Sequence, residues 1–327
     1  MTRILTRQDV EQLMDMEMAV EIVEAAFKSH GYGRTRIPHR SILELDEFNG
    51  MMGMMPAYLA DSQAAGVKII SHHAHNHKKG LPEGMGLILY HDPATGMPLA
   101  IMDCAHITAM RTGAATAVSV KYLGKKNTRV AGIVGTGVQA VFQVRAICQV
   151  SRLERVKAYD LRPDAMERFA ATAAPLGLEV ELVKNPEQAC REVDILATCT
   201  SSRHPFVKKE WLQEGVHIAA IGADMADRRE LSPQVYGSAD KCVTDLPKQA
   251  LLVGEITDAI ATGAIDEAAL HTTLGEIVAG KAKGRENDAE LTIFKSTGMA
   301  IQDIAVAKRV YELAIEKQAG VDIAITP

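Results

Sequence analysis

Apolar and polar residues follow different spacings in successive parts of the chain. Residues 7–30 carry apolar side chains at helical spacing, which predicts two helices that divide near Met16. Between residues 36 and 103 the apolar residues alternate or form short runs, and this pattern predicts strands. Two of these runs flank residues 92–96, a turn with proline and glycine, so we expect a hairpin there. A helix with small side chains on one face is predicted over 107–123.

From residue 129 onward, strands and helices alternate. Residues 129–134 form a β-branched run before a helical pattern, and similar pairs follow toward residue 245. This alternation predicts a doubly wound parallel sheet of the Rossmann kind. Residues 296–317 predict a long amphipathic helix, which we expect to leave the sheet and pack on the N-terminal part. The predicted fold is therefore α/β, with a dinucleotide-binding domain over 121–299 and an α+β domain formed by 1–120 and 300–327.

A glycine turn follows the first of these strands. Gly135, Gly137 and Ala140 have the G-x-G-x-x-A spacing, which allows a tight turn, a close approach of the backbone to a pyrophosphate, and close packing of helix and strand. The spacing alone also suits any strand–helix turn that needs small residues. Asp160, at the end of the next strand, makes the dinucleotide interpretation stronger, because an acidic side chain there binds ribose hydroxyls. It favours NAD over NADP, although Arg162 could pair with a 2′-phosphate.

Polar residues at the end of a later strand, "ATCTSS" over 197–202, are expected at the same carboxyl edge of the sheet. They either line the cofactor or cap the next helix. The predicted cofactor contacts are Gly135, Thr136, Gly137, Val138, Gln139, Ala140, Asp160, Arg162, Thr198, Thr200 and Ser201.

Three cations occur where a core would favour apolar residues, namely Arg40, Lys68 and Arg111. A buried cation needs an anion, and for any one of them an internal salt bridge is the ordinary explanation. Three in one domain beside a nicotinamide site suggest a pocket for a carboxylate. Asp224 follows a parallel strand at the carboxyl edge, where it could meet a substrate nitrogen; it could also cap the next turn, as could Asp227.

These residues lie in segments that resemble one family. "AGVKIIS", "N-x-x-KGLP", "LILYHDPATGMPLAIMD", "ITAMRTGAATAVSVKYL", "VGTGVQA", "HIAAIGAD…REL" and "STGMAIQD" occur in the order found in the ornithine cyclodeaminase/mu-crystallin family, nearest to its archaeal alanine dehydrogenase and imine reductase branch. The resemblance implies a homodimer whose N-terminal segment and last helix form a substrate-binding and dimerisation domain. It also implies that Arg40, Lys68 and Arg111 hold a substrate carboxylate, and that Lys68 and Asp224 are catalytic.

The resemblance implies hydride exchange between a nicotinamide and the α-carbon of an amino or imino acid, and leaves the substrate open. Where relatives commonly have prolines, the chain has "SHHAHNH", and alternation places His72 on the same face as Lys68, with His73 reaching it only if the chain turns. Imidazoles there could bind a second carboxylate, which makes reduction of iminosuccinate to L-aspartate the sharpest hypothesis. "MMGMMP" instead favours alanine or a simple ketimine. An ornithine or lysine cyclodeaminase with recycled NAD, and a non-catalytic mu-crystallin-like binding protein, are the alternatives.

The remaining features exclude other classes. His75 and His77 are expected in a solvated loop, and no metal is expected, because no cysteine or carboxylate accompanies the histidines. Among 327 residues the net charge is −5 and basic residues are dispersed, so no nucleic acid is expected; no apolar run approaches the roughly 20 residues that span a membrane. Five scattered cysteines indicate a reducing, cytoplasmic setting. Lys295, in the predicted loop "FKSTG", has no assigned role, and several relatives are acidic there.

Overall fold

The computed structural model describes residues 1–325, apart from the side chain of His77. The chain folds into two compact units, Met1–Arg111 with Met299–Pro327, and Thr112–Gly298. We call them unit 1 and unit 2. The first division lies inside helix α3 (Ala105–Leu123), whereas the sequence placed the boundaries at 120/121 and 299/300. Which function each unit carries stays a prediction.

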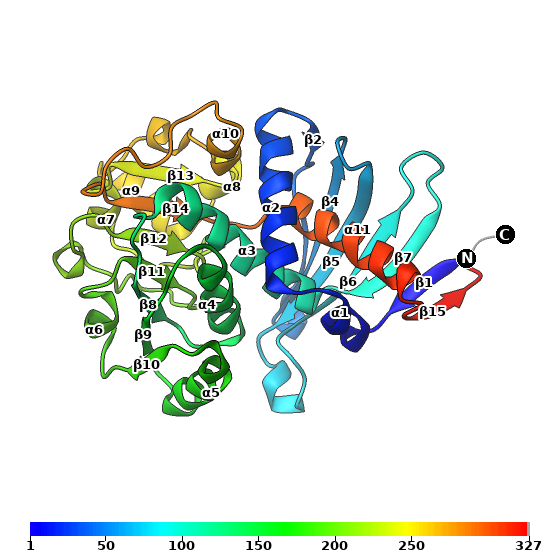
Figure 1. Ribbon diagram of the computed structural model, residues 1–327, viewed down its shortest axis with the longest axis horizontal. Helices are drawn as coiled ribbons and strands as arrows, with labels where there is room; N and C mark the ends of the chain where they lie inside the picture. Colours follow the sequence, from blue (N-terminus) through cyan, green and yellow to red (C-terminus); the bar gives the residue numbers. More distant parts are fainter. Residues whose placement is uncertain (326–327) are drawn as a thin grey trace. The chain divides into compact units, whose positions relative to one another are not determined.

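Unit 1 is an eight-stranded sheet with helices on one face (Figure 1). The order is β15-β1-β7-β6-β5-β4-β2, with β3 paired to β4, and β1–β7 is a parallel pair while the other pairs are antiparallel. The strands are β1 (Thr2–Leu5), β2 (Thr35–Arg36), β3 (Ser41–Leu45), β4 (Gly50–Leu59), β5 (Ala64–His73), β6 (Gly84–His91), β7 (Pro98–Asp103) and β15 (Val321–Ile323). The helices are α1 (Arg7–Leu13), α2 (Met16–Gly31) and α11 (Ala300–Glu316), with 3-10 turns η1 (Asp46–Phe48) and η2 (Asn76–Lys79).

Helices α2 and α11 cover the face of this sheet that holds the core (Figure 1). The predicted break near Met16 is confirmed: Asp15 caps α2 by accepting a hydrogen bond from the backbone N–H of Met18 at 2.9 Å. The predicted hairpin is confirmed as β6–β7, with Gly96 at φ 74°. The predicted last helix is confirmed as α11, which packs on α2, β4 and β5.

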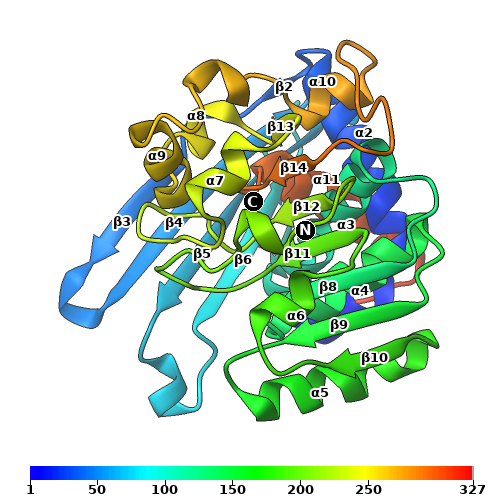
Figure 2. The ribbon, with the colours of Figure 1, turned by 90° about the vertical axis from the view of Figure 1, so that its left-hand side faces the viewer.

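Unit 2 is a seven-stranded parallel sheet in the order β10-β9-β8-β11-β12-β14-β13, which Figure 2 shows side by side. The predicted doubly wound α/β fold is confirmed. The strands are β8 (Val130–Val134), β9 (Arg155–Tyr159), β10 (Glu179–Leu182), β11 (Ile195–Thr198), β12 (His217–Ala220), β13 (Lys241–Thr244) and β14 (Thr292–Lys295). The helices are α4 (Val138–Val150), α5 (Pro163–Ala173), α6 (Pro186–Cys190), α7 (Pro233–Gly237), α8 (Pro247–Ala250), α9 (Gly254–Ala261) and α10 (Leu274–Val278), with η3 (Ala174–Leu176), η4 (Lys209–Trp211) and η5 (Glu267–Leu270).

The strand order of unit 2 decides where a ligand can bind. Successive strands run outward from β8 to β10 in one direction, and from β11 onward in the other, so the order reverses between β8 and β11. Ligands of such sheets bind at this reversal, outside the carboxyl ends of the strands. The turn at Gly135 and the end of β11 at Thr198 lie at these two carboxyl ends.

Strand β14 was missed in the sequence. Its four residues lie between β12 and β13, and its last residue, Lys295, is fully buried rather than part of a loop. A run this short carries no clear periodicity.

No described helix combines the length and the hydropathy that crossing a membrane requires.

Candidate active site

The glycine turn of unit 2 joins β8 to α4. Gly135 has φ 91°, and its backbone N–H donates to the carbonyl of Tyr159 at 2.8 Å. A Cβ at this position would lie 2.7 Å from the carbonyl oxygen of Cys199. Both the positive φ and the close approach therefore require glycine here.

Gly137 differs from Gly135 in what surrounds it. It is the exposed N-cap of α4, its φ is −71°, and a Cβ built on it would meet no atom within 4 Å. Neither backbone conformation nor packing within the described chain requires glycine at this position. The helix N-terminus behind it is open, as the approach of an anionic ligand requires.

Asp160 lies next to this turn. Its Oδ2 accepts from the backbone N–H of Thr136 at 2.7 Å and from the Thr136 hydroxyl at 3.3 Å, and its Oδ1 accepts from the backbone N–H of Arg162 at 3.0 Å. These contacts fix the carboxylate at the edge of the sheet while it stays half-exposed. The sequence-predicted turn and acidic residue are therefore in contact.

The polar residues at the end of β11 and in the loop after it are divided between two environments. Thr198 is fully buried and its hydroxyl donates to Glu230 at 2.8 Å, and Thr200 donates to the same carboxylate from its backbone N–H and its hydroxyl. Ser201 is exposed. Burial and the nearby charge of Glu255 raise the pKa of Glu230 to about 7. Contact of these residues with a cofactor stays a prediction.

A buried cluster of charges lies in unit 1, on the sheet face below α11. Lys68, on β5, donates from Nζ to Oδ2 of Asp303 at 2.8 Å, and Arg111, on α3, donates from Nε to Oδ1 of Asp303 at 3.0 Å. Arg111 also donates to the side-chain carbonyl of Gln302 at 3.2 Å. Lys68, Asp303 and Gln302 are 1%, 0% and 0% exposed. Two of the three predicted cations thus share one carboxylate, which the sequence analysis had not named.

The charges within this cluster shift its pKa values. Burial lowers the pKa of Lys68 to about 8, with Asp303 opposing this and Arg111 adding to it. Burial raises the pKa of Asp303, but the charges of Arg111 and Lys68 outweigh it, so that this pKa lies below its ordinary value. At neutral pH the cluster therefore carries two positive charges and one negative charge.

The third predicted cation and the histidines lie elsewhere in unit 1. Arg40 is half-buried immediately before β3. The β4–β5 register runs without a break to His73, so His72 shares the face of Lys68 and His73 points to the opposite face. Four residues of strand place His72 about 13 Å along β5 from Lys68. The strand makes no turn that would bring His73 to the face of Lys68. His75 is exposed, and the side chain of His77 lies outside the described residues.

Asp224 lies in the turn after β12, and Lys295 contacts the backbone of the same turn. Asp224 is exposed and follows Ala223 directly. Lys295 donates from Nζ to the backbone carbonyl of Ala223 and to Oε1 of Glu255, the latter at 2.8 Å. Lys295 and Glu255 are buried at 0% and 1% exposure, which assigns Lys295 an internal ion pair.

Four residues of these clusters were not predicted from the sequence. A polar pair inside an apolar helix, "AIQDIAVA", was the available signal for Gln302 and Asp303, because burial of that helix face obliges both to find partners. For Glu230 and Glu255 no local pattern distinguishes them from surface carboxylates.

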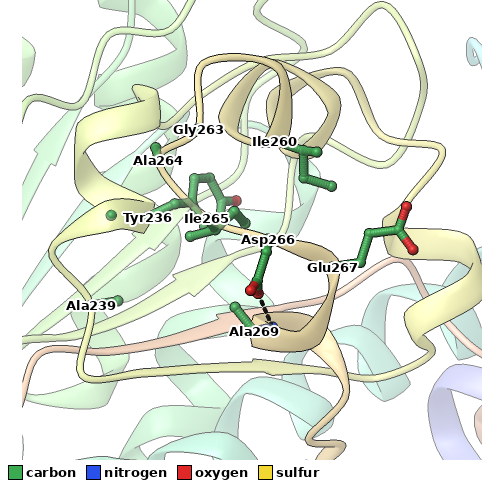
Figure 3. Close-up of a pocket in the computed structure, with 10 residues that line it drawn as sticks. Tyr236, Ala239, Ile260, Gly263, Ala264, Ile265, Asp266, Glu267 and Ala269 are labelled. Atoms are coloured by element: carbon green, nitrogen blue, oxygen red, sulfur yellow. Dashed lines mark hydrogen bonds between the residues drawn. The ribbon is translucent and has the colours of Figure 1, made fainter.

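A hollow in the surface of unit 2 borders Tyr236, whose hydroxyl donates to Glu255 of the buried cluster at 2.7 Å. This shallow hollow of about 790 Å³ is lined by residues of 236–239 and 260–269, among them Tyr236, Ile260 and Asp266 (Figure 3). It contains none of the sequence-predicted site residues, so we do not assign the chemistry to it. Among the described residues, no group of three or more His, Cys, Asp or Glu side chains is arranged to hold a metal ion.

The doubly wound sheet of unit 2 places the chain in the class of proteins built on a dinucleotide-binding fold. Within that class, the chain belongs to the ornithine cyclodeaminase/mu-crystallin family, whose model matches residues 1–318.

Three solved structures are similar over nearly the whole chain. The Δ1-pyrroline-2-carboxylate reductase of Thermococcus litoralis, in complex with NADH and L-proline, is 42% identical with a TM-score of 0.95 and covers 98% of this chain and 100% of its own. An archaeal alanine dehydrogenase, a dimer with bound NAD, is 43% identical with a TM-score of 0.94 over 99% of both chains. The iminosuccinate reductase of Paracoccus denitrificans with NAD⁺ is 35% identical with a TM-score of 0.91 over 98% and 99%.

Proposed function

We propose that the chain is an NAD-dependent oxidoreductase that transfers hydride between the nicotinamide and the α-carbon of a small imino or amino acid. The observation that carries this proposal is the buried cluster in which Lys68 and Arg111 share the single carboxylate of Asp303. The remaining positive charge suits the carboxylate that every α-imino acid carries. The three similar enzymes, which act on such compounds and bind NAD or NADH, support it.

The turn of unit 2 fits a dinucleotide. Gly137 is needed neither by packing nor by φ, and it leaves the start of α4 open to a pyrophosphate. Asp160 is held where its carboxylate can accept from both ribose hydroxyls. Its charge disfavours a 2′-phosphate, so we propose NAD as the cofactor and NADP as the poorer one. Thr200 and Ser201 are proposed to lie beside it.

Bound NADH supplies the hydride, and the chain's own side chains bind the substrate and move protons. We assign the substrate carboxylate to Arg111 and Arg40, whose guanidinium groups donate in pairs. The Nζ of Lys68, with its pKa of about 8, can hold or release a proton near neutral pH. Asp224 is assigned the proton on the substrate nitrogen, since it is exposed at the carboxyl edge of the sheet.

The substrate is the finer part of the proposal. Iminosuccinate is the sharpest candidate, because His72 shares the face of Lys68 and an imidazole can bind a second carboxylate. Alanine or a ketimine such as a pyrroline-2-carboxylate needs no such partner, and the relatives act on compounds of both kinds. His73 faces the opposite side of the sheet and has no part in this argument.

A substrate panel tests the proposal. NADH and NADPH oxidation are measured in parallel with oxaloacetate plus ammonia, pyruvate plus ammonia, and a preformed cyclic imine. We expect NADH to be preferred, and oxaloacetate plus ammonia to be the fastest pair. His72→Ala should then slow that pair while leaving pyruvate plus ammonia unchanged. A preference for pyruvate rejects iminosuccinate, and equal losses on both pairs give His72 a structural role.

Other results of the same panel would establish a different function. Ammonia release from ornithine or lysine without net change of NADH would show a cyclodeaminase. Tight NADH binding with no turnover of any substrate would show a non-catalytic binding protein.

We also propose a homodimer formed through unit 1. The sheet face away from α2 and α11 carries apolar side chains in register across strands, with Ile69 beside Leu87 and Met52 beside Leu43. Leu43 and Leu87 are 47% and 48% exposed. A second copy is the natural occupant of such a face. The similar archaeal alanine dehydrogenase is a dimer, which supports this proposal. Light scattering should give the mass of a dimer for the wild-type chain and that of a monomer for Leu87→Asp.

The cytoplasmic setting stays a prediction that rests on the scattered cysteines.

A further inference from the structure

Glu230 is a buried carboxylate that joins two loops at the carboxyl edge of the unit 2 sheet. At the end of β11, the Thr198 hydroxyl donates at 2.8 Å, and in the loop that follows, Thr200 donates from its backbone N–H at 2.6 Å and its hydroxyl at 2.8 Å. From the turn after β12, the backbone N–H groups of Gly222 and Ala223 donate at 2.9 and 3.2 Å. One side chain thus holds both strand ends.

The two loops are also in direct contact. A Cβ at Gly222 would lie 2.3 Å from the backbone carbonyl oxygen of Thr200 and 2.5 Å from Oε1 of Glu230. The backbone N–H of Gly222 also donates to the carbonyl of Thr198 at 3.0 Å. The separation of the loops is therefore fixed by packing as well as by the shared carboxylate.

A second layer holds Glu230 itself. Oε2 of Glu255 accepts from the backbone N–H groups of Glu230 and Leu231 at 2.7 and 3.0 Å, and Oε1 accepts from Lys295 and from the Tyr236 hydroxyl. Lys295 donates onward to the carbonyl of Ala223.

Both backbone groups of Ala223 are consequently bound, its N–H by Glu230 and its carbonyl by Lys295. The next residue is Asp224, which is exposed, so the backbone of this turn determines where its carboxylate lies.

We propose that Glu230 is a positioning residue that holds the loop carrying Thr200 and Ser201 in a fixed relation to the turn carrying Asp224. Glu255 and Lys295 extend this network to β14 and hold the Asp224 turn from its carbonyl side. The cofactor contacts and the group that serves the substrate nitrogen are then presented by one rigid unit, which lowers the reorganisation needed for hydride transfer. This inference rests on the proposed function of Asp224 and of the β11 loop.

The test compares Glu230→Gln with the wild-type chain at pH 8, above the pKa of about 7 of Glu230. The amide group keeps the shape but turns one acceptor into a donor that faces hydroxyl and N–H donors. Glu286→Gln is the matched control, since Glu286 is an exposed carboxylate of the same unit that pairs with Lys241 and Lys283.

Three measurements are made on each protein. We expect Glu230→Gln to speed hydrogen exchange at the amides of Thr200, Gly222 and Ala223 about 10-fold or more, and to weaken NADH binding. We expect kcat per NADH-binding site to fall about 10–100-fold with little change in the KM of the imine, whose carboxylate is assigned to unit 1. The isotope effect with NADH deuterated at C4 should rise, because hydride transfer becomes rate-limiting.

A loss of folded protein alone would change neither the isotope effect nor kcat per binding site. Unchanged exchange at the three amides in Glu230→Gln overturns the inference, whatever the enzyme's activity. Faster exchange with unchanged kcat and isotope effect overturns the positioning role as well. If the wild-type chain binds no NADH, the proposed function fails separately, and the exchange measurement still decides whether Glu230 holds the loops.

Discussion

Each unit of the molecule buries a small cluster of charges, and the two clusters have opposite composition. In unit 1, Lys68 and Arg111 share the carboxylate of Asp303. In unit 2, Glu230 and Glu255 lie close to the single cation Lys295. The first cluster has one positive charge in excess, and the second has one negative charge in excess above the pKa of about 7 of Glu230.

The two clusters differ in whether groups of the chain itself compensate the excess charge. In unit 2, backbone N–H groups and hydroxyls donate to both carboxylates, so the excess is held within the chain. In unit 1, the Nε2 atom of Gln302 is buried with no hydrogen-bond partner among the described residues. A buried excess of cations with a spare donor suits an incoming anion. We therefore propose the unit 1 cluster as the ligand site, whereas the hydrogen bonds of the unit 2 cluster hold parts of the fold together.

Lys68→Met should give the largest effect on activity. We expect kcat to fall about 10²–10⁴-fold, the range for loss of a proton-transferring side chain. Lys68→Arg should not restore it, since a guanidinium does not give up its proton at working pH. Because Arg111 still pairs with Asp303, the free energy of unfolding should fall by less than the about 3–5 kcal/mol that an unpaired buried charge costs. Restored turnover in Lys68→Arg would limit Lys68 to a charge role.

Lys295→Met should lower the stability of the protein strongly and its activity only slightly, the opposite of what we expect for Lys68→Met. It removes the cation of the unit 2 cluster and leaves Glu255 buried, so we expect unfolding to become easier by about 3–5 kcal/mol in urea titrations. Activity per folded molecule should fall far less than in Lys68→Met. Lys283→Met, at an exposed pair with Glu286, is the control and should leave the urea midpoint in place. Equal urea midpoints for Lys295→Met and Lys283→Met would contradict the structural role of Lys295.

Asp303→Asn should shift the pH dependence of the enzyme. The Asp303 charge raises the pKa of Lys68, whereas burial and Arg111 lower it to about 8. Removing that charge therefore lowers the pKa of Lys68 further, by about 1–3 units if an opposite charge at this distance is lost. Substrate binding that depends on charged Lys68 should then be lost at lower pH. The test is the pH at which kcat/KM falls on the basic side of the pH profile, measured for the variant and the wild type. If this pH is the same in both, the basic limb does not report the titration of Lys68.

Gln302→Glu should make the net charge of the unit 1 cluster less positive and thus closer to that of the unit 2 cluster. A second carboxylate beside Arg111 removes the excess positive charge, so a substrate carboxylate should bind less well. We expect the KM of the imine to rise about 10–100-fold, which corresponds to roughly 1–3 kcal/mol. The urea midpoint should be unchanged or higher. An unchanged KM would show that the excess charge does not bind the substrate.

The elements that were predicted correctly depend on neighbours in sequence. The tight turn at Gly135, the break near Met16 and the hairpin at residues 92–96 are set by local backbone preferences. Strand β14 was missed because four residues carry too little pattern. As a result Lys295 was placed in a loop, although it is buried in the sheet.

The same limit applies to the candidate site. Lys68 and Arg111 were recognised as unusual because each stands in an apolar stretch of its own. Asp303, their partner, is 235 residues from Lys68 along the chain and 2.8 Å from it in space.

The α/β class, the dinucleotide turn and the family could be predicted from the sequence, because strand periodicity and turn chemistry act over a few residues. Tertiary structure alone decided which charges meet. Whether a buried lysine faces an internal carboxylate, as Lys295 and Lys68 do, depends on strands and helices brought together from distant segments. That pairing sets the sign of the excess charge, and with it the difference between the two clusters.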